Sequence, residues 1–370
     1  MKIQYPVYKP SLLGNEKKYV NECLDSTWIS SKGKFVSEFE NKFAEFVGVK
    51  HAITVSNGTV ALHLALLALG IGKDDEVIVP TLTYIASVNS ITYTGATPVF
   101  VDSLRDTWQI NPEDVKKKIT PKTRAIMAVH LYGHSCDMDA LIALANEHGL
   151  FLIEDCAEAF GSLYKGTHVG SFGDISTFSF FGNKTITTGE GGMVITNDDT
   201  LFDRALHLKG QGLAMHREYW HDVVGYNYRM TNICAAIGLA QLEQAKFFIE
   251  KKIEIAAWYK EFLQNVPVEV HKETENVKHS YWMVSILVNK ITHRDKLRKH
   301  LEDNGIETRP LFYPIHTMPM YSIKYLKHPV AEDLGWRGLN LPSYPELNKR
   351  DVTYICDKIK GYFYERHSDK

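Results

Sequence analysis

The sequence predicts an α/β fold, with a large domain built on a mainly parallel sheet and a smaller α+β domain after it. Short apolar runs such as EVIVP and RAIMAVH are rich in β-branched residues and do not alternate with polar ones, which is typical of parallel strands covered on both faces. Segments of helical periodicity follow these runs. A length of 370 residues suits one large and one smaller domain.

The first half of the chain alternates between the two kinds of element. Strands are expected at HAITVS, EVIVP, TPVFVDS, RAIMAVH and FLIEDCAEA. Helices are expected at TVALHLALLALG, YIASVNSITYTG and MDALIALANEHG, joined to the strands by right-handed crossovers. Two further extended runs, DISTFSFF and GGMVITND, follow, so the segment between them is expected to be a loop between strands.

The pattern changes near Tyr259. Beyond it, SYWMVSILV and IETRPLF are extended runs, HRDKLRKHLEDNG has a helical pattern, and a last helix is expected near Asp351 to Tyr364. We therefore expect the large domain, with an N-terminal arm, at residues 1–250 and the small α+β domain at residues 251–370.

The composition argues against several classes of function. Forty-two basic and 44 acidic side chains give a net charge of -2, which provides no global field for nucleic acid or an anionic membrane. The N-terminus lacks the apolar core of a signal peptide, and no stretch has the length of a membrane-spanning helix, so we expect a cytoplasmic protein. The five cysteines are scattered without a CxxC pair, and no metal site is expected.

One lysine stands out in the stretch TFSFFGNKTITTGEGG. Lys184 could be a solvated loop charge, or it could contact a phosphate or form a Schiff base. The GxxxxGK[ST] spacing of a phosphate-binding loop is absent. Ligands of open α/β sheets bind outside the carboxyl ends of the strands, and the expected place of this loop favours the second reading.

Three other loops on the same expected edge carry candidate ligand-binding residues. In VSNGTVAL, the amides of Gly58 and Thr59 would point at a phosphate from the start of a helix, although an ordinary N-capped turn has the same pattern. Asp155 follows an apolar strand and could pair with a ring nitrogen, and Glu158 could face the same space. Tyr84 could lie against an aromatic cofactor or pack in the core.

Together these residues predict pyridoxal 5'-phosphate as the cofactor. This molecule has an aromatic ring with a protonatable nitrogen, a carbonyl that condenses with a lysine, and a phosphate. Lys184 would form the imine, and the small residues after it would leave room for cofactor and substrate.

The chain also resembles, essentially from end to end, the sugar-nucleotide aminotransferases of the DegT/DnrJ/EryC1/StrS family. The segments that carry the resemblance are STWISSKGKFVSEFE, VSNGTVALHLAL, VPTLTYIAS, IEDCAEAFGS, STFSFFGNKTITTGEGG, GYNYRMTNICAAIGLAQL and RPLFYPIHTMPMY. The resemblance implies the fold-type I architecture of aspartate aminotransferase. It also implies a homodimer or higher homo-oligomer with active sites shared between subunits.

The resemblance implies roles around the cofactor ring. Lys184 would be the catalytic acid and base, and Asp155 would pair with the ring nitrogen. Tyr84 would stack on the ring, and Glu158 would approach the ring hydroxyl.

The resemblance also implies a phosphate site and a sugar pocket. Gly58, Thr59 and Ser179 would bind the cofactor phosphate, completed by Asn227 of the neighbouring subunit. Further substrate candidates lie in family segments that border the sugar pocket: Ser30, Tyr313 and His316.

Within the family, the sequences of these segments most resemble those of members that move an amino group from L-glutamate to C4 of GDP-4-keto-6-deoxy-D-mannose. These members give GDP-perosamine for O-antigen and lipopolysaccharide synthesis. The alternatives are a pyridoxal phosphate-dependent dehydratase or 3-aminotransferase acting on a related nucleotide ketosugar, or a catalytically idle binding protein. The dehydratase has histidine in place of Lys184, and histidine does not form an imine. An idle protein would be expected to lose part of the site, whereas Lys184, Asp155, Ser179 and Asn227 are all present.

Overall fold

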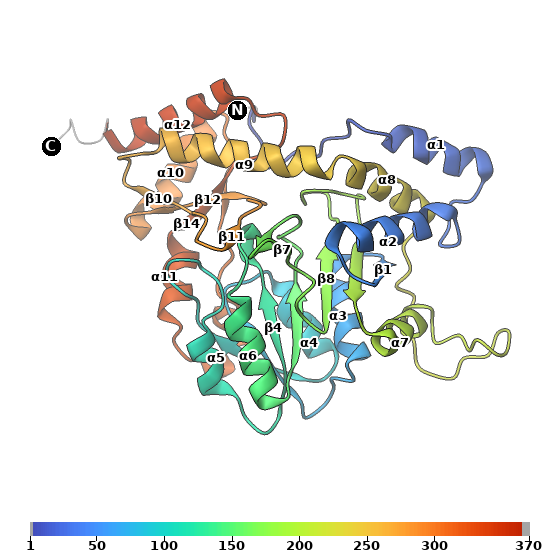
Figure 1. Ribbon diagram of the computed structural model, residues 1–370. Coiled ribbons are helices and arrows are strands. Elements are labelled where there is room, and N and C mark those ends of the chain that lie inside the picture. Colours follow the sequence, from blue (N-terminus) through green and yellow to red (C-terminus); the bar gives the residue numbers. More distant parts are fainter. Residues whose placement is uncertain (1–2, 365–370) are drawn as a thin grey trace.

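A seven-stranded sheet forms the centre of the large domain in the computed structural model, which describes residues 3–364 (Figure 1). In spatial order its strands are β1 (His51–Val55), β9 (Gly192–Thr196), β8 (Ile175–Ser179), β5 (Phe151–Asp155), β4 (Thr123–Val129), β2 (Glu76–Pro80) and β3 (Thr97–Val101). Strand β9 runs antiparallel to both of its neighbours, and every other neighbouring pair is parallel. The predicted α/β fold with a mainly parallel sheet is confirmed.

Helices cover both faces of this sheet (Figure 1). On one face lie α3 (Gly58–Ala68), α4 (Ile85–Tyr93) and α7 (Asp199–Lys209). On the other lie α2 (Lys34–Val47), α5 (Pro112–Lys118), α6 (Met138–His148) and α8 (Asn232–Glu243). Along β2, Val77 and Val79 face the first group while Ile78 faces the second, which explains why the strand reads as an unbroken apolar run.

Shorter elements surround the main sheet. A small antiparallel sheet contains β7 (Thr167–His168), β6 (Leu163–Tyr164) and β11 (Val277–Lys278). Helix α1 (Glu16–Ser26) precedes α2 and packs against α8. Single 3-10 turns occur at Leu131–Gly133, Ile315–Thr317 and Ser322–Lys324.

The C-terminal part has its own antiparallel sheet and core. The strands, in spatial order, are β10 (Val268–Val270), β12 (Val284–Val288), β14 (Gly338–Leu341) and β13 (Arg309–Pro310). Its helices are α10 (Ile291–Asp303), α11 (Pro329–Arg337) and α12 (Lys349–Tyr364). Apolar side chains of α10 and α12 pack on this sheet, as in the expected α+β arrangement.

One long helix joins the two cores. Helix α9 (Ala245–Phe262) places Phe248 and Ile249 in the core of the large domain and Ile255 and Tyr259 in the core of the C-terminal part. The division between residues 250 and 251 therefore falls inside a continuous helix and stays a prediction.

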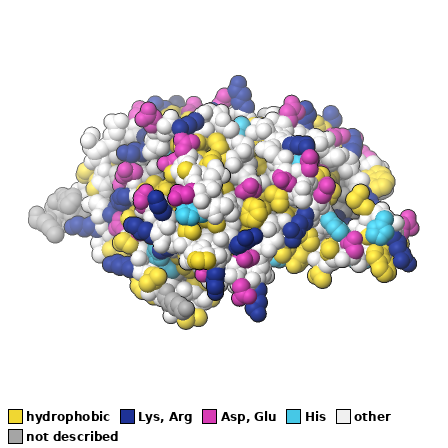
Figure 2. All heavy atoms as spheres, turned by 60° about the horizontal axis from the view of Figure 1, so that its bottom comes forward, with side chains coloured by type: hydrophobic (Ala, Val, Ile, Leu, Met, Phe, Trp, Pro, Cys, Tyr) yellow, Lys and Arg dark blue, Asp and Glu magenta, His cyan; other side chains and the backbone are white. Residues whose placement is uncertain are grey.

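Residues 210–231 form an extension between α7 and α8, and its outer part stands off the body at the right of Figure 1, whereas Tyr228 and Met230 pack against the body. Large exposed apolar side chains of this extension are Leu213, Met215, Tyr219, Trp220 and Val224. Figure 2 shows basic and acidic side chains interspersed over the face in view, in keeping with the near-neutral net charge. Within residues 3–364, no helix combines the length and apolar character needed to cross a membrane.

Candidate functional site

The sheet brings most of the predicted site residues to one edge. Asp155 and Ser179 are the last residues of β5 and β8, and Lys184 lies in the loop between β8 and β9, as expected. Gly58 begins α3 after the short turn that follows β1, and Tyr84 precedes α4 after β2. All of these segments follow the carboxyl ends of parallel strands, which is where ligands of such sheets bind.

Lys184 points into a largely buried space between a carboxyl group and an aromatic ring. Its Nζ lies 3.9 Å from Oε1 of Glu158, and 13% of its side chain is exposed. The same nitrogen lies 3.8 Å from the centroid of the Trp282 ring. Burial lowers the pKa of Lys184, while the carboxyl groups of Glu158 and Asp155 oppose that change. An amine with a lowered pKa is better able to act as a nucleophile and as a base near neutral pH.

Asp155 is held in place by two donors. Ser87 Oγ, from the first turn of α4, donates to Asp155 Oδ2 at 2.7 Å, and the amide of Ala157 donates to Oδ1 at 3.1 Å. Ser87 is itself hydrogen-bonded to Thr83 Oγ1 at 2.9 Å. The carboxyl group is buried and fixed, so it could keep a proton on a nitrogen of a bound ring.

Glu158 is a buried carboxyl group that shares the space with Lys184. The amide of Tyr132 donates to Glu158 Oε2 at 2.8 Å. Burial raises the pKa of Glu158 to about 7, although Lys184 acts in the opposite direction. A carboxyl group that keeps its proton near neutral pH can donate a hydrogen bond to a phenolate oxygen, whereas a carboxylate would repel it.

Gly58 and Ser179 form a close-packed cradle at the start of α3. A Cβ atom on Gly58 would lie 2.7 Å from Cβ and 2.9 Å from Oγ of Ser179. Asn57 Oδ1 caps the helix by accepting from the amide of Val60 at 3.0 Å. The cap therefore uses the third amide of the helix, and the amides of Gly58 and Thr59 remain available to an anion. The N-capped turn is confirmed, and the binding of a phosphate by Gly58 and Thr59 stays a prediction.

Two predicted cofactor residues lie outside the buried group. Tyr84 is 55% exposed, and its ring centroid is 5.4 Å from that of Phe312, so the residue is accessible to a ligand. Asn227 is exposed on the extension and accepts from Arg229 Nη2 at 3.2 Å.

The three substrate candidates make contacts elsewhere. Ser30 lies in the exposed connection between α1 and α2, where its carbonyl accepts from the amide of Asn232 at 2.9 Å. Tyr313 packs against Trp336, with ring centroids 4.8 Å apart. His316 is buried, with its Nδ1 2.7 Å from Thr81 Oγ1. Their roles toward a substrate stay predictions.

Several residues at the site were not found from the sequence. Trp282 and Tyr132 reach the site from distant segments, and no local pattern marks them. Ser87 stands three residues after Tyr84 in VPTLTYIAS, so helical periodicity could have placed it beside Tyr84 at the same strand end.

A buried cluster of potential metal ligands lies behind the site. The ligand atoms of His130, Glu154 and Cys156 lie within 4.8 Å of one another. Glu154 already accepts from His130 Nε2 at 2.9 Å and from the amides of Gly170 and Phe172 at 2.7 and 2.8 Å. The cluster therefore fastens the segment after β7 to β5.

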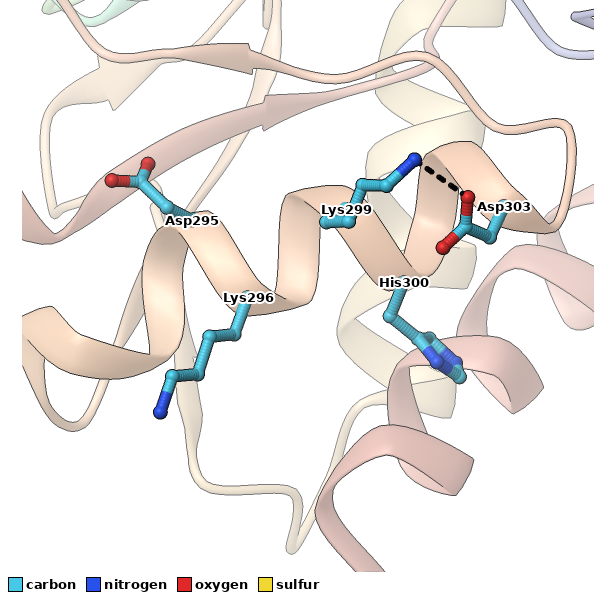
Figure 3. Close-up of a pocket in the computed structure, with 5 residues that line it drawn as sticks. All are labelled: Asp295, Lys296, Lys299, His300 and Asp303. Carbon is cyan, nitrogen blue, oxygen red and sulfur yellow. Dashed lines mark hydrogen bonds and ion pairs between the residues drawn. The ribbon is translucent and has the colours of Figure 1, made fainter.

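A shallow pocket on the small domain is separate from the site. It is lined by five side chains of α10, drawn in Figure 3: Asp295, Lys296, Lys299, His300 and Asp303. Lys299 Nζ pairs with Asp303 Oδ1 at 2.7 Å, as on an ordinary solvated helix face. None of the predicted site residues lines this pocket.

Comparison with known proteins places the chain among sugar aminotransferases. The DegT/DnrJ/EryC1/StrS aminotransferase family matches residues 10–360. The GDP-perosamine synthase of Escherichia coli O157:H7 is 69% identical over 98% of this chain and 99% of its own. The GDP-perosamine synthase of Vibrio cholerae is 56% identical over 97% of this chain and 99% of its own.

Solved structures of aminotransferases share the fold. DesV of S. venezuelae, solved in complex with a ketimine intermediate, has a TM-score of 0.90 and 34% identity over 95% of this chain and 94% of its own. The sugar aminotransferase Spr1654 of Streptococcus pneumoniae, described as putative and solved in its PMP form, has a TM-score of 0.93 and 27% identity over the whole of both chains.

Proposed function

Because the chain belongs to the DegT/DnrJ/EryC1/StrS aminotransferase family, we propose that it transfers the amino group of L-glutamate to C4 of GDP-4-keto-6-deoxy-D-mannose, giving GDP-perosamine. The observation that carries the proposal is the 69% identity to a GDP-perosamine synthase over almost the whole chain. Family and fold make the protein a pyridoxal phosphate-dependent aminotransferase that takes a sugar nucleotide and an amino donor.

The residues at the sheet edge fit the cofactor. The crowded contact between Gly58 and Ser179 leaves room for backbone amides and a hydroxyl but not for a side chain at position 58, as a phosphate site requires. Asp155 would hold the proton of the ring nitrogen, and the exposed Tyr84 would stack on the ring. When bound, pyridoxal phosphate withdraws electrons from the carbon that carries the amino group.

The chain's own residues would then handle the protons. Lys184 would remove a proton from that carbon and return it at a neighbouring position, which requires an amine that is neutral part of the time. Burial lowers the pKa of Lys184 toward that condition. Glu158, whose pKa is raised to about 7, would donate to the ring hydroxyl oxygen, and Ser87 keeps Asp155 facing the ring.

A homodimer is part of the proposal. In the extension at residues 210–231, Met215, Tyr219 and Val224 are almost fully exposed, and their burial against a partner subunit would stabilise a dimer. The same extension carries Asn227, which would complete the phosphate site of the partner. We expect the wild type to sediment as a dimer. We expect Val224→Asp to dissociate into monomers and to bind the cofactor more weakly. A monomeric and fully active wild type would contradict this part.

The assignment of substrate and position is tested with labelled donor. The purified protein is incubated with [15N]glutamate and GDP-4-keto-6-deoxymannose, and the product is examined by mass spectrometry and NMR. Nitrogen-15 at C4 is the expected result. Label at C3 would favour a 3-aminotransferase, and loss of oxygen without label would favour a dehydratase. A role in O-antigen synthesis and a cytoplasmic location stay predictions.

A further inference from the structure

The loop that carries Lys184 is fastened by two aromatic side chains from outside the central sheet. Trp282 Nε1 donates to the carbonyl of Asn183 at 2.7 Å. The hydroxyl of Tyr8 donates to the carbonyl of Lys184 itself. Two consecutive carbonyls, at and beside the reactive lysine, are thus each held by a residue far away in the sequence.

Trp282 makes a second contact, with the lysine side chain. Its ring centroid lies 3.8 Å from Lys184 Nζ. The ring is 4% exposed and lies nearly parallel to that of Tyr132, at 6.1 Å between centroids and an interplanar angle of 9°. Tyr132 in turn holds Glu158 through its amide. The indole ring therefore has a fixed position, and its cation–π interaction favours the charged form of the Lys184 amine.

Tyr8 is anchored on the side of the small domain. The amide of Val7 donates to Glu307 Oε2 at 2.9 Å, and Tyr5 pairs with Ile306. The ring of Tyr8 lies 5.2 Å from Nζ of Lys252, a fully buried amine that donates to the carbonyl of Ser343 at 2.6 Å. The segment that carries Tyr8 is therefore held against the C-terminal part of the chain, which fixes the position of the Tyr8 hydroxyl.

From these contacts we propose that Tyr8 and Trp282 are positioning residues for Lys184, with the Trp282 ring holding the charged amine whenever it is free and both donors fixing its backbone. The inference rests on the proposed function, because it assigns roles around the lysine of that reaction. By this proposal, the small domain positions Lys184 through Trp282, and the N-terminal arm positions it through Tyr8.

Other groups also act on the charge of Lys184. Glu158 and Asp155 are the carboxyl groups that favour the ammonium form. The Tyr8 hydroxyl donates to the Lys184 carbonyl, and the backbone amide of Tyr132 donates to Glu158. Burial, together with the charge of Glu158, raises the pKa of the Tyr132 phenol well above its ordinary value. These groups are unchanged in the Trp282 variants, so a difference between variants reports the ring.

The first test needs no substrate. The full-length chain is freed of cofactor, and the rate at which added pyridoxal phosphate forms its visible band is followed against pH. Condensation uses the neutral amine, so the midpoint reports the charge of Lys184. In Trp282→Leu the midpoint should fall by about 0.5 to 1 pH unit, because the ring no longer favours the ammonium form. In Trp282→Phe, which keeps a ring, the shift should be smaller.

The control is a second lysine–tryptophan contact far from the site. Trp258 lies 5.8 Å from Lys251 Nζ, both on α9, and Trp258→Leu should leave the midpoint where the wild type has it. The role of the ring would be overturned if the pH midpoint of band formation in Trp282→Leu equalled that of the wild type and of Trp258→Leu.

The second test addresses the backbone contacts and does not depend on a stable Trp282→Leu variant. Tyr8→Phe and Trp282→Phe each remove one donor and keep a ring. The glutamate half-reaction at saturation should slow about tenfold in each, with KM changed less than about twofold, because a hydrogen bond is lost at the lysine but not at the donor. Unchanged rates in both would overturn the positioning role. A wild type inert toward glutamate would instead refute the proposed donor.

Discussion

The reactivity of Lys184 depends on four side chains from three separate segments. Glu158 follows β5, Asp155 ends β5, Trp282 precedes β12, and Tyr8 belongs to the N-terminal arm. Burial lowers the pKa of the Lys184 amine, and the two carboxyl groups oppose that change, so the amine gives up its proton more readily than a solvated loop lysine would. The chemistry therefore requires both a lysine at position 184 and the neighbouring side chains that set its pKa and its position.

Replacing the lysine tests its role directly. In Lys184→Ala, turnover should fall about a thousandfold or more, because the amine that moves the proton is removed. Lys246→Ala is the control, since Lys246 is an exposed lysine of α9 that pairs with Glu250 only at 3.9 Å. Product formation from both variants would be measured by mass spectrometry. Near-normal turnover in Lys184→Ala would refute the assignment.

At the scale of single residues, the sequence was informative where a residue follows a strand. Asp155 and Gly58 could be placed at one sheet edge because each follows an apolar run, whereas Ser179 lies inside the run DISTFSFF and was expected at the site only from the family resemblance. Trp282 lies 98 positions beyond Lys184 and has no motif of its own, so its contact follows from packing between domains and not from local pattern. The same holds for Tyr8.

Among the elements, the start of α3 and the ends of β1 and β8 form the proposed phosphate cradle. Gly192, the first residue of β9, contributes to the crowding, because a Cβ on it would lie 2.6 Å from the carbonyl oxygen of Asn57. The backbone can approach closely here because Gly58 and Gly192 lack side chains, and a phosphate would meet backbone amides and the Ser179 hydroxyl.

A side chain at position 58 should impair cofactor binding. In Gly58→Ala the new methyl group must displace Ser179, so the affinity for pyridoxal phosphate should fall at least about tenfold, which corresponds to about 1.4 kcal/mol. Gly182→Ala is the matched control, because a Cβ there meets no atom within 4 Å. Titration of the cofactor-free chains, followed by visible absorption, gives both affinities. Equal affinities would argue against a cradle at Gly58.

The order and type of the elements could largely be predicted, but two features could not. The reversed direction of β9 leaves no trace in GGMVITND, because a buried strand has the same apolar run in either direction. Helix α9 spans both cores, and its unbroken helical pattern gives no sign of a boundary between domains. Both features depend on tertiary packing.

Across the whole molecule, three buried histidines join the large and small domains. The ring of His134 lies 5.6 Å from that of His271, which lies 4.9 Å from that of His279. His271 Nε2 lies 3.0 Å from the carbonyl oxygen of Thr107, and His134 Nε2 lies 3.0 Å from Thr274 Oγ1. Burial lowers the pKa of His134 to about 4 and those of the other two well below their ordinary value.

This cluster should make the protein sensitive to acid. A lowered histidine pKa means that the fold favours the neutral ring, so the associated stability is present above about pH 6.5 and is lost as the pH falls toward 4. For His134 the loss between pH 7.5 and pH 5 amounts to about 2 kcal/mol. Between pH 7.5 and pH 5, the melting temperature of His134→Gln should therefore fall by less than that of the wild type. The exposed His216→Gln is the control, and a wild-type slope in His134→Gln would contradict the prediction.

The most direct measurement follows the visible absorption of the cofactor in the purified protein while L-glutamate and then GDP-4-keto-6-deoxymannose are added, with the product's mass recorded. We predict that glutamate bleaches the band and that the sugar nucleotide restores it as an aminated nucleotide sugar appears. A band that does not respond to glutamate, or that responds without formation of an aminated product, would contradict the account.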